Sequence, residues 1–123
     1  MYTLDTNILI YYLDNELPAR KFLKKQVLGK IPLFVSTATE HELYCYSRLT
    51  PSDAADIEHV LDMFTLMNIN SQIARISAQL RRAYKMKPMD SFIAATAAMT
   101  KTTLVTRNVK DVRRIKEISI HAI

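Results

Sequence analysis

Carboxylates supply most of the chemistry available to this chain, and several of them stand where strands are expected to end or helices to begin. Asp5 closes the first short apolar run, and Asp90 precedes a helical segment. Asn108 and Asp111 follow another apolar run near the carboxyl end. In a parallel α/β sheet these positions share one side, where ligands bind. Converging carboxylates repel one another unless a cation neutralises them, and hard oxygen donors suit Mg²⁺ or Mn²⁺. Such an ion activates water and stabilises the transition state of phosphoryl transfer.

A purely structural role would also account for each of these acids. Asp5 could cap a helix that begins near Asn7, and Asp90 could cap a helix that begins at Ser91. Asp111 could simply stabilise a helix by placing its negative charge near the positive, amino-terminal end of the helix dipole. The residues alone leave both interpretations open.

Glu42 falls on a stripe that is otherwise apolar. Ala38, Glu42, Cys45 and Leu49 recur at helical spacing. An inward carboxylate predicts a cation beside it, either a basic side chain or a metal, because a buried unpaired charge is costly. The alternative is a glutamate at the edge of the stripe that reaches solvent.

Two segments carry the pattern of a helix start. Thr37-x-x-Glu40 matches a capping box, in which Glu40 reaches back to the first turn. Thr50-Pro51-Ser52-Asp53 matches a second box, with Pro51 in the first turn. Glu40 is therefore expected to have a structural role.

Short apolar runs alternate with segments of helical periodicity along the chain. The predicted strands are residues 2–4, 33–35, 66–69, 103–106 and 118–120. The predicted helices cover 7–13, 18–28 and 91–100, with others starting near 37, 51 and 71. This alternation predicts a three-layer α/β/α fold with a central, mainly parallel sheet. The length suits a single domain over residues 1–123.

The composition is basic, with 17 Lys and Arg against 12 Asp and Glu and a formal net charge of +5. This excess favours binding to polyanions such as nucleic acid, although charged runs also form solvated helix faces. The single Cys45 excludes an internal disulfide and a cysteine-rich metal cluster. Because no apolar run is long enough for a signal-peptide core or a membrane span, we expect a cytoplasmic protein without membrane association.

Four ordered blocks of the sequence resemble the PIN-domain ribonucleases, and among them the VapC-like toxins of toxin–antitoxin pairs. The blocks are Leu4-Asp5-Thr6-Asn7, Ser36 to Leu43, Asp90 to Ala97, and Leu104 to Asn108. Each block is weak alone, but their order and spacing cover essentially the whole chain, so the resemblance is specific.

The resemblance implies a PIN-like nuclease that hydrolyses RNA phosphodiester bonds with Mg²⁺ or Mn²⁺ as cofactor. Its implied catalytic residues are Asp5, Glu42 and Asp90. It also implies polar support from Asn7 and Thr106, to which we add Thr6. The metal ligands we expect are Asp5, Asp90, Asn108 and Asp111, the last from its position and not from the resemblance. The resemblance further implies RNA as substrate, a small cognate antitoxin protein as partner, and a homodimer.

The chain departs from the family pattern at the fourth acidic position, which falls on Asn108. An amide oxygen can still ligate a hard cation, so the site would be weaker rather than dead. If the chain turns into a helix after Thr106, Asn108 and Asp111 lie on one face. We expect Asn108 in the metal site and Asp111 in its outer shell.

Two other function classes compete with the nuclease. The first is a PIN-like RNA-binding or protein-interaction domain whose catalysis is weakened by Asn108. The second is a phosphoryl-transfer enzyme with Asp5 as nucleophile. Against the second, Asp5-Thr6-Asn7 lacks the second acid two residues later that such phosphatases share.

Overall fold

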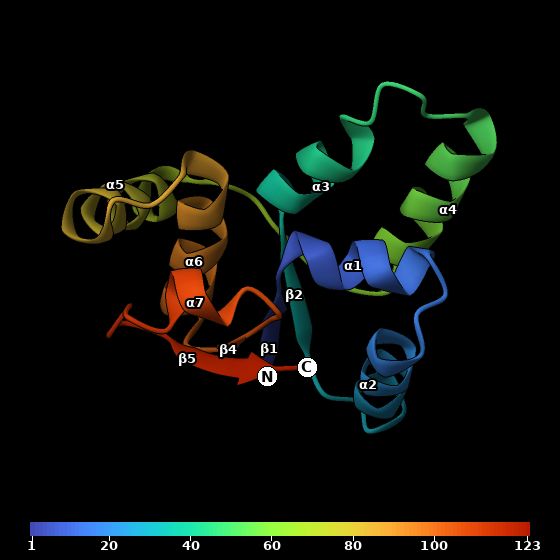
Figure 1. Ribbon diagram of the computed structural model, residues 1–123, viewed down its shortest axis with the longest axis horizontal. Helices are drawn as coiled ribbons and strands as arrows, with labels where there is room; N and C mark the ends of the chain where they lie inside the picture. Colours follow the sequence, from blue (N-terminus) through green and yellow to red (C-terminus); the bar gives the residue numbers. More distant parts are fainter.

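A sheet of five strands runs through the centre of the computed structural model, which describes residues 1–123 (Figure 1). The strands are β1 (Tyr2–Leu4), β2 (Leu33–Ser36), β3 (Thr65–Met67), β4 (Thr103–Thr106) and β5 (Ser119–Ala122). Their order is β3-β2-β1-β4-β5, and every neighbouring pair is parallel. The first strand of the chain is therefore the middle strand of the sheet.

Helices cover both faces of the sheet. On one side lie α1 (Thr6–Leu13), α2 (Leu17–Leu28) and α4 (Pro51–Leu61), to the right in Figure 1. On the other side lie α5 (Ser71–Tyr84), α6 (Pro88–Thr100) and the short α7 (Val109–Val112). The remaining helix, α3 (Thr37–Tyr44), follows β2 directly. The predicted three-layer α/β/α fold is confirmed, and its sheet is entirely parallel.

Each face of the sheet has its own hydrophobic core. Adjacent residues of a strand point to opposite faces, so Leu104 packs in the core with Ile93 and Val105 packs in the core with Ile8. On α6, the small side chains at 94, 95 and 97 are fully buried. They let this helix approach the sheet closely, which places its first turn near the ends of the strands.

The helix starts agree only in part with the sequence. Thr50 and Asp53 form the predicted capping box of α4. The box predicted for Thr37 and Glu40 is wrong: Ser36 caps α3 by accepting a hydrogen bond from the Ala38 N–H at 3.0 Å. Because β2 runs straight into α3, the cap falls one residue earlier than predicted.

Several element boundaries also differ from the predictions. The third strand ends at Met67 and the last extends to Ala122. Helix α6 begins at Pro88 rather than Ser91, because proline fits the first helical position, where no N–H donor is needed. No helix in the structure is long and apolar enough to cross a bilayer.

Candidate active site

Asp5 and Thr106 bring the ends of β1 and β4 together. The Thr106 hydroxyl donates a 2.7 Å hydrogen bond to Oδ2 of Asp5, and the Asp5 N–H donates to the Val105 carbonyl at 3.0 Å. Asp5 occupies the N-cap position of α1, but its side chain makes no capping hydrogen bond. The capping role considered for Asp5 is therefore wrong, and its carboxylate faces the edge of the sheet.

The pKa of Asp5 is raised above its ordinary value. Burial is the largest cause, and the negative charge of Glu42 adds to it. Hydrogen bonds from Thr106 and from the Thr6 backbone act in the opposite direction. Burial and a neighbouring like charge destabilise the ionised form of Asp5. A bound cation would relieve both effects.

Glu42, on α3, is connected to this end of the sheet by a hydrogen bond from the Thr6 hydroxyl. The Thr6 hydroxyl donates to Oε1 of Glu42 at 2.7 Å and lies 3.0 Å from the hydroxyl of Thr39. Glu42 itself is exposed and no basic side chain pairs with it, so it follows the alternative of a glutamate at the edge of the stripe that reaches solvent. A metal partner for Glu42 stays a prediction. The helix ends at Tyr44, which takes the rest of the proposed stripe out of helical register.

Asp90 lies in the first turn of α6 and not at its N-cap, which is Lys87. The pKa of Asp90 is raised, first by burial and then by the negative charges of Asp5 and Asp111, while Lys87 lowers it. Asp90 and Asp111 line one cavity, and Asp5 is close enough for its charge to act on Asp90. The buried Ser91 hydroxyl donates to the Pro88 carbonyl and meets the Ser77 hydroxyl, both at 2.6 Å, which fixes this turn against α5.

Asn108 and Asp111 bond to each other across the start of α7. The Asn108 side-chain amide donates to Oδ2 of Asp111 at 2.6 Å, and the Asn108 N–H donates to the Thr106 hydroxyl at 2.9 Å. The Thr106 hydroxyl thus links the Asn108 backbone to Asp5. Asp111 is exposed, whereas Asn108 is half-buried.

The donor set fits a hard divalent cation. Asp5 and Asp90 are two nearby carboxylates whose pKa values are both raised, and their repulsion would be relieved by a cation. No group of three or more His, Cys, Asp or Glu side chains forms a ready-made metal cage. Mg²⁺ does not require one, because it usually keeps several waters and binds one or two carboxylates.

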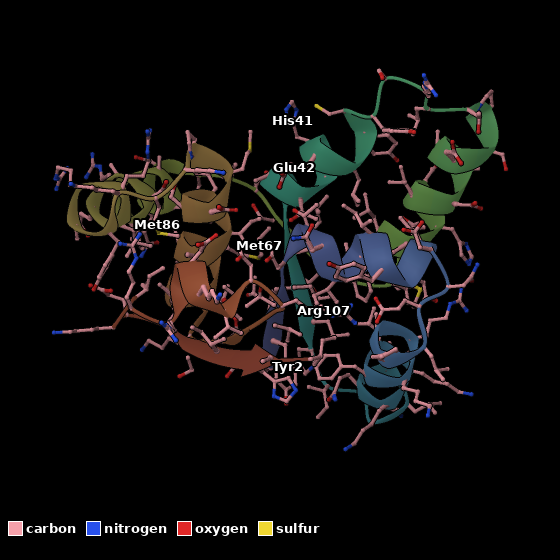
Figure 2. The ribbon with its side chains drawn as sticks, viewed as in Figure 1. Tyr2, His41, Glu42, Met67, Met86 and Arg107 are labelled. Carbon is pink, nitrogen blue, oxygen red and sulfur yellow. The ribbon has the colours of Figure 1, made fainter.

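Arg107 locks the end of β4 in place. Its guanidinium forms a two-pronged ion pair with Glu16, with Nη1 to Oε2 at 2.6 Å, and lies 4.1 Å from the Tyr11 ring centroid. Its Nε donates to the Ile123 carbonyl at 3.1 Å. Figure 2 shows Arg107 beside α1 and Glu42 on α3. Arg107 lies between Thr106 and Asn108, so this anchor fixes the backbone that carries both.

The sequence missed several residues that support the site. Thr39, Ser91 and Arg107 lie within the family blocks, but the sequence pattern predicts no role for them in the site. Thr39 stands three residues before Glu42, a helical spacing that could have placed both on one face. Asn7 is exposed, and its side chain makes no hydrogen bond to the residues of the site.

Comparison with known proteins gives the family. The PIN domain family matches residues 2–118. The chain belongs to the PIN-domain family. It is 26% identical to Ribonuclease VapC2 of Methanocaldococcus jannaschii, with 94% of this chain and 89% of that protein covered. It is thus homologous to the VapC ribonucleases.

Solved structures of the same PIN-domain fold cover the chain end to end. A toxin–antitoxin complex from Klebsiella pneumoniae contains a chain that is 31% identical, with a TM-score of 0.80 and full coverage of both chains. VapBC2 from Rickettsia felis, bound to a DNA fragment from its promoter, has a TM-score of 0.87 at 21% identity. That match covers 99% of this chain and 98% of the other.

Proposed function

We propose that this PIN-domain protein is an endoribonuclease that hydrolyses RNA phosphodiester bonds with Mg²⁺ or Mn²⁺, and that it is the toxin of a toxin–antitoxin pair. The observation that carries the proposal is the pair Asp5 and Asp90, two acids with raised pKa values at one edge of the sheet. Homology to VapC2 supplies the reaction class.

The proposed roles follow from the contacts of each side chain. Asp5 and Asp90 hold the ion, and Thr106 keeps Asp5 in position. Glu42, held by Thr6, orients the attacking water from the α3 side. When bound, a divalent cation supplies a Lewis acid that activates water and balances the charge of the phosphoryl transition state.

Asn108 and Asp111 complete the proposed site. Asn108 contributes its amide oxygen to the ion, and Asp111 lies in the outer shell, where it accepts the hydrogen bond of the Asn108 amide group. Asn108 stands where the family pattern has an acid, and this missing charge supports a second candidate function. That candidate is a PIN domain with weakened catalysis that acts by binding RNA or protein.

A groove beside Glu42 supports a protein partner. This cavity of about 630 Å³ lies between α1, α3 and α4. Ile10, Leu43 and Ile57 are among its apolar lining residues, and Asp14 and Asp56 are among its acids. An amphipathic segment of an antitoxin with basic residues would complement this lining. We expect the protein also to form a homodimer, checked by light scattering during size-exclusion chromatography.

Cleavage of a labelled single-stranded RNA tests the function. The chain should cut RNA with Mg²⁺ or Mn²⁺ and stop when a chelator is added. Its expression alone should arrest growth, and a small partner encoded beside it should restore growth. RNA binding without any metal-dependent cleavage would instead support the second candidate.

A further inference from the structure

A cavity of about 220 Å³ opens beside Asp90 and has a wall of mixed charge. Asp90 and Asp111 line it together with Lys85, Lys87 and Arg114. We propose that this cavity binds the phosphate of the RNA nucleotide next to the one cleaved, with Lys87 and Arg114 as its main ligands. The inference rests on the proposed nuclease function and assigns the position of the substrate strand beside that site.

Two arginines, Arg81 and Arg114, are bonded to the turn between α5 and α6. The carbonyl of Tyr84 accepts a hydrogen bond from Nη2 of Arg114, and the carbonyl of Met86 accepts one from Nε of Arg81 at 3.3 Å. Lys85, between them, has a left-handed backbone with φ of 54°. Met86 lies beside α6 in Figure 2. Because guanidinium groups tie down two carbonyls of this turn, a bound anion would order little additional structure.

The amino end of α6 adds positive potential to the same cavity. Lys87 is the N-cap residue, Pro88 follows it, and no side chain caps the first turn. Uncapped amides and the helix dipole favour an anion at this end. Lys87 is also close enough to Asp90 to offset part of the rise in the pKa of that acid.

The cations outnumber the acids along this wall and continue beyond it. Lys85, Lys87 and Arg114 face two carboxylates, and Glu117, a further nearby acid, accepts a 2.8 Å hydrogen bond from the Tyr84 hydroxyl. A neighbouring cavity of about 550 Å³ is lined by Ala78, Arg81, Arg82, Lys85 and Met86 and by no acid. The two cavities share Lys85 and Met86, so together they form a basic path that leads away from Asp90.

A nucleic acid strand matches this arrangement better than an acidic peptide. Cleavage requires one phosphate at the carboxylates, and the next phosphate along the strand must lie within one nucleotide of it. Lys87 stands three residues before Asp90 at the same helix end and lines the same cavity, so its ammonium group can contact such a phosphate. The basic path over α5 then accommodates further phosphates, which give affinity without base specificity.

Binding of a fluorescein-labelled single-stranded RNA to the full chain in EDTA tests the inference without cleavage. The variants are Lys87→Gln and Lys87→Gln/Arg114→Gln. Matched controls are Lys24→Gln and Lys24→Gln/Lys25→Gln, which remove the same charge from exposed positions of α2, at the far side of the sheet (Figure 1). Fluorescence anisotropy gives the Kd at several salt concentrations.

Removal of each cavity cation should raise the Kd about five- to tenfold, and the steepness of log K against log salt should fall by about 0.7 for each lost phosphate contact. The α2 variants should change the Kd less than about twofold. Equal losses in both sets would overturn the inference. Unchanged RNA affinity with weaker binding of poly-glutamate would also overturn it, in favour of an acidic peptide.

Two readouts keep this inference separate from the nuclease function. If the unsubstituted chain cleaves RNA with Mg²⁺ but the cavity and control variants bind RNA equally well, the phosphate-binding role of the cavity is overturned and the nuclease function is not. If only the cavity variants bind RNA more weakly and the unsubstituted chain does not cleave RNA, the nuclease function is overturned and the phosphate-binding role of the cavity is not. Lys87 is exposed, so the Lys87→Gln variant should keep the Tm of the unsubstituted chain. If the double variant fails to fold, the RNA affinity of this single variant tests the inference.

Discussion

The hydroxyl of Thr106 donates to the carboxylate of Asp5 at 2.7 Å across 101 positions of sequence. This bond joins the ends of two neighbouring strands, and the same hydroxyl accepts the Asn108 N–H. A single side chain therefore couples Asp5 to the turn that carries Asn108 and Asp111.

Asp5→Asn and Asp90→Asn should each reduce RNA cleavage at least about a hundredfold, because each removes a charged metal ligand without changing side-chain volume. Circular dichroism should show an unchanged fold. Asp62→Asn, which alters an exposed carboxylate at the end of α4, is the matched control and should retain cleavage. Retained activity together with a large loss of Tm in the Asp5 or Asp90 variants would make these acids structural.

The stability of the metal-free protein should depend on the ionisation of Asp5. Its pKa in the folded chain lies above the ordinary 3.8. Between these two values the folded chain binds more protons than the unfolded chain, so the free energy of unfolding falls as the pH rises. Asp5→Asn removes this penalty and should raise the Tm by a few degrees at pH 7.

Thermal melts of both proteins in EDTA across the acidic range measure this effect. The gain in Tm from Asp5→Asn should shrink as the pH falls through the raised pKa and should level off below pH 3.8. A gain of constant size at every pH would show that ionisation of Asp5 is not its source.

Asn108→Asp should tighten Mg²⁺ or Mn²⁺ binding by about tenfold, the equivalent of about 1.4 kcal/mol, because it adds a charged ligand. It also sets a second carboxylate against Asp111, so the metal-free Tm should fall. Asp111→Asn should weaken metal binding only slightly. Isothermal titration with each metal gives these affinities, and a large loss for Asp111→Asn with no gain for Asn108→Asp would reverse the two roles.

Arg107→Lys should lower the Tm by a few degrees, because lysine cannot reproduce the two-pronged contact with Glu16 or the stacking on Tyr11. Glu16→Gln should lower it less. If the pair acts as a unit, the double variant should lose less than the sum of the two single losses. Additive losses in chemical denaturation would show that Arg107 acts mainly through Tyr11 or the Ile123 carbonyl.

Periodicity predicted the layers and the parallel sheet because buried strands and amphipathic helices leave strong local patterns. It placed Asp5 at a strand end, and the structure agrees. It left open whether Glu42 faces inward, because the apolar stripe needs Cys45 and Leu49 in the same helix and α3 ends at Tyr44. The Arg107 anchor joins residues from three separate segments, so no local pattern could predict it.

The central position of β1 has a consequence for the growing chain on the ribosome. β1 is synthesised before β2 and β4, the two strands that flank it, and it pairs with β4 only after residues 103–106 have emerged. Until then Asp5 lacks Thr106, and the turn with Asn108 does not yet exist. Nascent chains should therefore carry no assembled site, so a ribonuclease of this design would be inert towards the ribosome and messenger RNA that are producing it.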